Sequence, residues 1–168
     1  FYGTIPSGGQ ILIPNGYAIT VDPLVPDGQN IPFEVIATDG ANNWLSYFSL
    51  EAHAPVLAIS DFSVFDPAGN NNGILDPGET ADIVVDISNT GTSGALSVTG
   101  ELLSSDPYIT INSGTLNYGS IGAGGFETKS FSVTADNNTP TGHMTAFNFN
   151  ISAALGITAT GAFSVVVG

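Results

Sequence analysis

The sequence contains no cysteine, so disulfide bonds and thiolate metal sites are both excluded. It has one basic residue, Lys129, against fifteen acidic residues, which gives a formal net charge of -14. Nucleic acid is excluded as a partner, because binding to phosphate groups requires clustered lysine and arginine side chains. The chain also lacks any run of about 18 apolar residues, so no transmembrane helix and no membrane insertion are predicted.

Short segments of alternating apolar and polar residues make up most of the chain, and glycine, proline, asparagine and aspartate separate them. In segment 81–89, Ile83, Val85 and Ile87 alternate with polar residues, as in a strand that buries one face. No segment of ten or more residues has the apolar spacing of a helix. The same period of two recurs at Phe131 and Val133, at Phe147, Phe149 and Ile151, and at Phe163, Val165 and Val167. These patterns predict an all-β fold, an immunoglobulin-like antiparallel β-sandwich.

An internal repeat divides the chain. Residues 2–5 (YGTI) match residues 118–121 (YGSI) at an offset of 116 positions. Residues 26–29 match residues 140–143, Phe33 matches Phe147 and Phe48 matches Phe163, at offsets of 114 or 115. We therefore predict one complete sandwich over residues 55–168, preceded by a half unit over residues 1–54 that corresponds only to the C-terminal half of the repeat.

Half a sandwich has an uncovered apolar face and open strand edges, so residues 1–54 should require complementing strands. The neighbouring domain, an upstream segment or another copy of the chain could supply these strands by β-strand addition. The residues expected at this interface are Tyr2, Ile11, Ile13, Phe33, Trp44 and Phe48.

The loop 66–79 has the residues of a calcium site, because calcium binds six to eight oxygen atoms and such loops need a glycine at a sharp turn. With Gly73 as the sixth loop position, the spacing follows most of the EF-hand pattern. The first position would be Ala68, which cannot bind a cation, so Asp66 would have to reach in from a slightly longer loop. The alternative is a polar turn without metal. The predicted ligands are Asp66, Asn70, Asn72, the backbone carbonyl of Ile74, Asp76 and Glu79.

The run GNNNGILDPGETADIVVDISNTG, followed by SSDPYITI, YGSIGAGG and a closing FSVVVG, resembles the CARDB-like immunoglobulin-like repeats of large secreted bacterial proteins. Such repeats occur beside gingipain-like and subtilisin-like protease domains and in long surface proteins. The resemblance covers nearly the whole chain. It implies a β-sandwich, an extracellular or cell-surface location and bound calcium, with Asp66, Asn70, Asn72, Asp76 and Glu79 as ligands.

The sequence predicts no enzymatic activity. Only His53 and His143 could act as bases near neutral pH, and the repeat has Gln29 in place of His143. There is no cysteine nucleophile, no G-x-S-x-G elbow and no H-E-x-x-H helix. A catalytic pair of carboxylates remains open from composition alone.

The first functional expectation is a subunit of an extracellular filament, in which head-to-tail copies complete each other's half units. The alternative is a spacer or accessory domain of a larger secreted protease or adhesin, whose partners are neighbouring domains of the same protein. A minor alternative is a carbohydrate-binding module that uses Trp44 and the tyrosines as stacking platforms.

Overall fold

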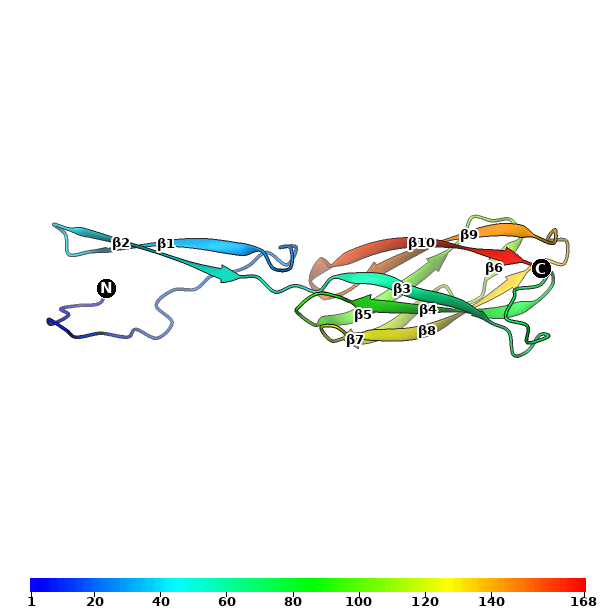
Figure 1. Ribbon diagram of the computed structural model, residues 1–168, viewed down its shortest axis with the longest axis horizontal. Helices are drawn as coiled ribbons and strands as arrows, with labels where there is room; N and C mark the ends of the chain where they lie inside the picture. Colours follow the sequence, from blue (N-terminus) through cyan, green and yellow to red (C-terminus); the bar gives the residue numbers. More distant parts are fainter.

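The computed structural model describes residues 1–168 and consists almost entirely of antiparallel strands (Figure 1). The single helical segment is a 3-10 turn at Ala154–Gly156. Two four-stranded sheets and one separate two-stranded sheet make up the fold. The predicted all-β class with antiparallel sheets is therefore confirmed. No helix in the structure is both long enough and apolar enough to cross a bilayer.

The two four-stranded sheets pack face to face and form the sandwich. One sheet has the strand order β10-β9-β5-β7 and the other has the order β3-β4-β8-β6. The strands are β3 (Leu57–Phe65), β4 (Thr80–Asn89), β5 (Ala95–Leu103), β6 (Ile109–Ile111), β7 (Thr115–Ile121), β8 (Phe126–Ala135), β9 (His143–Ser152) and β10 (Thr158–Val167).

The core lies between these sheets, because alternate residues of each strand point inward. Ile83, Val85 and Ile87 of β4 are fully buried, as their spacing predicts. Phe131 and Phe149 meet edge to face at 5.4 Å across the core. All 28 buried residues lie at or after Ala52, so the molecule's only hydrophobic core belongs to the sandwich.

The remaining two strands, β1 (Asn30–Thr38) and β2 (Asn43–Glu51), form a hairpin. Asp39 closes its turn by accepting hydrogen bonds from the backbone N–H groups of Ala41 and Asn42, at 2.9 and 2.7 Å. Figure 1 shows the hairpin end to end with the sandwich, while residues 1–29 run beside the hairpin without forming a strand. The hairpin therefore extends the molecule lengthwise and adds no layer to the sandwich.

The hairpin repeats the geometry of β9 and β10. Phe33 pairs with Phe48 across the strands and stacks on it at 5.0 Å, and Phe147 and Phe163 do the same at 5.5 Å. The turns that precede β1 and β9 also agree. Gly28 N–H donates to the Ala52 carbonyl at 2.9 Å, and Gly142 N–H donates to the Val167 carbonyl at 2.8 Å.

The correspondence extends to the turns that contain Asp22 and Asp136. Asp22 Oδ1 accepts the N–H of Leu24 at 2.8 Å, and Asp136 Oδ1 accepts the N–H of Asn138 at 2.7 Å. The two aspartates are separated by the same 114 positions as the turns that follow them. Residues 22–52 thus reproduce the local structure of residues 136–167.

Candidate functional site

The first candidate site is the face of the hairpin that corresponds to the core-facing side of β9 and β10. Phe33 and Val35 of β1 occupy the positions of Phe147 and Phe149, which are fully buried in the sandwich. On β2, Phe48 is 49% exposed and Leu50 is 45% exposed, whereas their counterparts Phe163 and Val165 are 8% and 7% exposed. The hairpin therefore carries a core face without a core.

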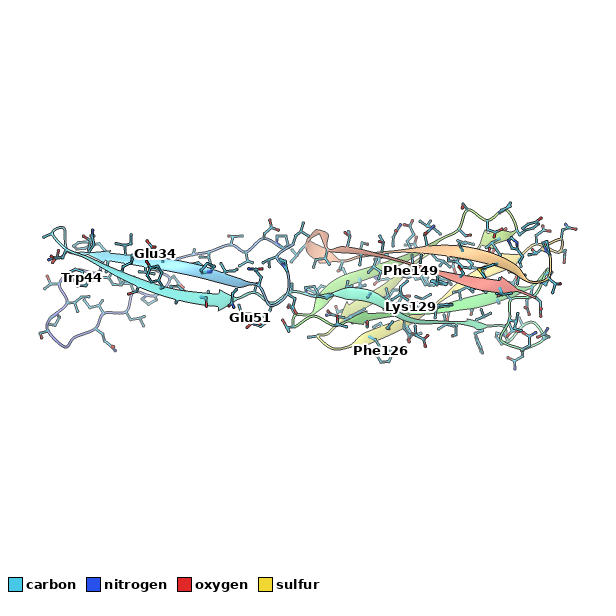
Figure 2. All side chains as sticks on the ribbon, turned by 45° about the horizontal axis from the view of Figure 1, so that its top comes forward. Glu34, Trp44, Glu51, Phe126, Lys129 and Phe149 are labelled. Atoms are coloured by element: carbon cyan, nitrogen blue, oxygen red, sulfur yellow. The ribbon has the colours of Figure 1, made fainter.

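The missing cover can be identified from the complete unit. There, β9 pairs with β5 on the edge away from β10, and the opposing sheet consists of β3, β4, β8 and β6. Residues 1–54 contain no counterparts of β3, β4, β5 or β6, so the outer edge of β1 has no strand beside it. Figure 2 shows Trp44 and Glu34 on this hairpin, far from Phe149 in the sandwich.

All six residues predicted at the interface lie in this unit, and none is buried. Trp44 is 53% exposed. The predicted interface residues Tyr2, Ile11 and Phe48 are exposed, and Ile13 and Phe33 are half-buried.

A joint connects the two units, and its central residue is Asp27 in the turn before β1. Asp27 Oδ1 accepts hydrogen bonds from Ala54 N–H at 2.8 Å and from the Thr92 hydroxyl at 2.5 Å. Its second oxygen accepts the Thr92 N–H at 3.1 Å. The hydrogen bonds from Ala54 and Thr92 lower the pKa of Asp27 below its ordinary 3.8. Asp27 therefore ties the hairpin unit, residues 1–51, to both the linker, residues 52–56 between β2 and β3, and the sandwich.

The linker itself lies tightly against the loop after β4. A Cβ atom at Gly91 would lie 2.2 Å from the Ala54 carbonyl oxygen and 2.6 Å from the Val56 nitrogen, so only glycine fits there. His53 Nδ1 lies 2.7 Å from the Thr92 hydroxyl. Asp27 could not be identified from the sequence, because its partners are far away in the sequence and its repeat counterpart is Thr141.

Asn89 fixes the other side of this loop. Its side chain is fully buried, and its Oδ1 accepts the N–H groups of Val56 at 3.0 Å and Gly91 at 3.1 Å. Its Nδ2 donates to the carbonyls of Ser93 at 2.8 Å and Ile121 at 3.1 Å. One amide thus joins the start of the sandwich to two loops, as a buried polar group must be fully paired.

The second candidate site is the loop 66–79, between β3 and β4. Asp66 is 1% exposed and reaches into the loop from its start. Its carboxylate accepts the N–H of Gly73 at 2.9 Å and of Asn72 at 3.1 Å. Gly73 has a φ of 77°, which favours glycine at this turn. Asp66 therefore organises the loop from two positions before Ala68.

Four more of the predicted ligands converge on the same loop. The Nδ2 atoms of Asn70 and Asn72 donate to Asp76 Oδ2 at 2.6 and 3.0 Å. Glu79 accepts the N–H of Asp76 at 2.9 Å. The Glu79 carboxylate also lies against Gly69, where a Cβ atom would be 1.3 Å from Oε1. The exposed Ile74 donates its N–H to Asn72 Oδ1 at 2.7 Å.

The fit of this loop to a cation is chemical more than geometrical. The side-chain atoms of this loop that could bind a cation are all carboxylate or amide oxygens, which are ligands that calcium prefers. However, no three acidic or histidine side chains in the structure gather closely enough to hold a metal ion. The Asn70 and Asn72 amides present nitrogen to Asp76, so both would have to rotate to present oxygen instead.

The two histidines lie at opposite ends of the sandwich. His53 lies in the linker, and His143 Nε2 lies 2.7 Å from Asp106 Oδ2, within hydrogen-bond distance. Burial raises the pKa of Asp106. The hydrogen bonds from Thr145, Tyr108 and His143 together lower it by more than burial raises it, so the pKa lies below its ordinary value. Tyr108 packs edge-on against His143 at 5.1 Å. These contacts join the loop before β6 to β9.

The aromatic residues do not form one platform. Tyr118 is buried in the core and donates its hydroxyl to the Val85 carbonyl at 3.0 Å. Tyr108 is held against His143. Trp44, Tyr47 and Tyr17 are exposed on the hairpin unit.

No protein-family model matches the chain. No curated protein sequence matches it either. Among solved structures, the PapD-like domain 7 of human CEP192 is 13% identical, with a TM-score of 0.37, over 67% of this chain and 84% of that one. The FixG-related protein from Vibrio parahaemolyticus is 11% identical, with a TM-score of 0.36, over 68% of this chain and 95% of that one.

A third similar structure is the sporulation control protein Spo0M from Bacillus subtilis. It is 14% identical, with a TM-score of 0.37, over 70% of this chain and 50% of that one. Likenesses of this degree carry no inference about function.

Proposed function

We propose that this chain is a non-catalytic structural module of an extracellular protein, in which immunoglobulin-like sandwich units are joined end to end as a spacer or stalk. The observation that carries the proposal is the half unit of residues 1–54. It repeats the local geometry of β9 and β10, yet its core face is uncovered. Strands from outside these 54 residues would be needed to cover this surface.

The physical need for these strands follows from the size of the hairpin. A two-stranded hairpin is at best marginally stable in water without further strands or a packed layer. Its exposed Phe48, Leu50 and Trp44 add an apolar patch that a free surface would not favour. The missing half of a sandwich would supply hydrogen-bond partners for the open edge and packing partners for the open face.

A preceding unit is the better source of these strands than another copy of this chain. The sandwich already uses its own β3, β4, β5 and β6 to cover β7, β8, β9 and β10. A second copy would have to open its own sandwich to donate them, and it would lose as many contacts as it gained. The filament subunit, which the sequence favours first, therefore becomes the second candidate. Its remaining support is the exposed edges of β1 and β2, which suit strand addition.

The joint supports an end-to-end arrangement. Asp27 of the half unit binds the linker and the loop at Thr92, while Gly91 lets the linker lie directly on that loop. These contacts order the connection between consecutive units.

We also propose that loop 66–79 binds calcium, because its side-chain donors are all oxygen-bearing. Asp66, Asn70, Asn72, Asp76 and Glu79 would hold the cation, with the carbonyl of Ile74. A bound cation would neutralise part of the acidic charge in this loop and fix its course between β3 and β4. Millimolar calcium outside cells would favour occupancy of a site of moderate affinity.

The test is sedimentation velocity and negative-stain electron microscopy of the purified chain in millimolar calcium, with an oligosaccharide titration followed by Trp44 fluorescence. We expect elongated, dispersed monomers and no saturable change at Trp44. Regular filaments would replace the spacer with the filament subunit. Saturable binding of an oligosaccharide would replace both with a carbohydrate-binding module.

A further inference from the structure

We propose that the free edge of β1, from Glu34 to Thr38, receives an antiparallel strand of the β5 type from the N-terminal half of a preceding unit. The register is the one that joins β9 to β5 in the complete sandwich. This inference rests on the proposed function and identifies the partner of the uncovered hairpin. It is carried by the internal repeat, because the same surface appears in the molecule both covered and uncovered.

The register follows from the covered copy. There, Thr99 pairs with Ser152, Gly100 with Ile151 and Leu102 with Phe149. The positions 114 residues earlier on β1 are Thr38, Ala37 and Val35. In an incoming strand, the counterpart of Gly100 would therefore lie opposite Ala37. The counterpart of Leu102, an apolar residue two positions later, would lie opposite Val35.

The side chains of β1 also define what the incoming strand carries. In the sandwich, Gly100 admits no side chain, because a Cβ atom would lie 2.5 Å from Phe149 Cζ and 2.7 Å from Tyr118 Cε2. In the hairpin unit, the counterpart of Phe149 is the smaller Val35. The counterpart of Tyr118 is Tyr2, which keeps the aromatic ring, so only the contact with Phe149 is relaxed in the half unit. The partner strand thus has the alternation of β5 and carries glycine or another small residue opposite Ala37.

The remaining cover follows from the same comparison. In the sandwich, β8 packs its Phe131 and Val133 between the sheets and is hydrogen-bonded to β4 and β6. The counterpart of residues 131–135 of β8 is the segment 17–21, which contains Tyr17, Ile19 and Val21 at alternate positions, all exposed. This segment forms no strand. Counterparts of β4 and β6 on its two sides, with a counterpart of β3 next to that of β4, would complete the second sheet once the β5-type strand is in place.

The complete 168-residue chain, extended at Phe1 by a copy of residues 55–116, tests the inference. Residue 117 is the repeat counterpart of Phe1, so this graft restores a whole unit in the correct order. Amide hydrogen exchange of Glu34–Thr38 should slow at least tenfold relative to the unextended chain. The emission of Trp44, the only tryptophan, should shift to shorter wavelength.

The matched control carries Val98→Asp and Leu102→Asp in the grafted copy only. Both residues are buried in the native sandwich, so the control graft should leave exchange in β1 fast. Equal exchange in the unextended, grafted and control chains would overturn the inference. If Glu34–Thr38 of the unextended chain become protected as its concentration rises, a second copy is the occupant and the assigned source is wrong. Failure of the proposed function is detected separately, by sedimentation and the oligosaccharide titration of the unextended chain.

Discussion

Asn89 determines how the chain enters the sandwich. Its amide accepts two backbone N–H groups and donates to the carbonyls of Ser93, Ile121 and Gly122. It is fully buried, so no water can replace these bonds. Its contribution is therefore larger than that of an exposed asparagine at a strand end.

Replacing Asn89 by alanine should lower the free energy of unfolding by about 2 to 4 kcal/mol, because several buried backbone groups lose their partners. Urea denaturation measures this change. Ser88→Ala, one residue earlier on β4, is the matched control and should cost less than about 1 kcal/mol. Equal small effects of both substitutions would contradict the role of Asn89.

Single residues differ in how far the sequence predicts them. The alternation of Ile83, Val85 and Ile87 predicts their burial because the period of a strand is local. Asn89 and Asp27 escape prediction because their partners lie in other elements. As the last residue of an alternating strand, Asn89 marks in the sequence only where that strand ends.

At the scale of elements, the loop 66–79 carries the calcium prediction. Asp76→Ala with Glu79→Ala should remove the stabilisation by calcium and leave stability in chelator nearly unchanged. At a free calcium concentration of 100 times the Kd, binding stabilises the parent by about 2.7 kcal/mol. Thermal unfolding of parent and variant, each in calcium and in chelator, measures the difference.

Asp82→Ala with Glu127→Ala provides the control, since it also removes one aspartate and one glutamate, but from strands β4 and β8 and not from the loop. This control should keep the full calcium response. If calcium does not change the melting temperature of the parent, the proposal that loop 66–79 binds calcium is wrong.

The joint is the second element with a testable role. Asp27→Ala removes the acceptor of Ala54 N–H and Thr92 N–H, so hydrogen exchange at both amides should accelerate. Asp27→Asn keeps one acceptor oxygen and should have an intermediate effect. The melting temperature of the sandwich should remain within about 1 °C, because the hydrogen-bond partners of Asp27, Ala54 and Thr92, lie outside the core cluster that begins at Leu57. Unchanged exchange in Asp27→Ala would exclude the joint.

The same joint should depend on pH in one direction. Its hydrogen bonds lower the pKa of Asp27 in the folded chain, so they stabilise the joint above the ordinary value of 3.8. This contribution is lost as the pH falls through the lowered pKa. Exchange at Ala54, compared with the Asp27→Ala variant at each pH, should therefore converge with that variant only below about pH 4.

Strands could be predicted from the sequence where the alternation of apolar and polar residues is complete within the strand itself. The repeat matches Phe33 and Phe48 to Phe147 and Phe163 and so predicts two strands there, and the structure contains β1 and β2 at these positions. Segment 17–21 has the alternation of a strand, yet it forms none, because its hydrogen-bonding neighbours are missing. In loop 66–79 the spacing predicts which residues converge, but the orientation of the Asn70 and Asn72 amides depends on what they bind.

For the whole molecule, deletion of residues 1–54 should leave a folded, soluble sandwich. The core cluster begins at Leu57, so the deletion removes none of its residues. Cooperative thermal unfolding with a melting temperature within a few degrees of the parent is expected. Loss of cooperative unfolding would show that the hairpin stabilises the sandwich. Filaments formed by the truncated chain would exclude any role of residues 1–54 in assembly.

The attachment of Leu75 to the end of β10 has a mechanical consequence. Leu75 lies in the loop 66–79, is fully buried, and forms a parallel bridge with Val167. Its carbonyl accepts the N–H of Gly168 at 3.0 Å. A pulling force applied at Gly168 acts along β10, so its hydrogen bonds to β9 are loaded together in shear. The same force reaches Leu75 directly, and a cation held by this loop would make the module stiffer under tension.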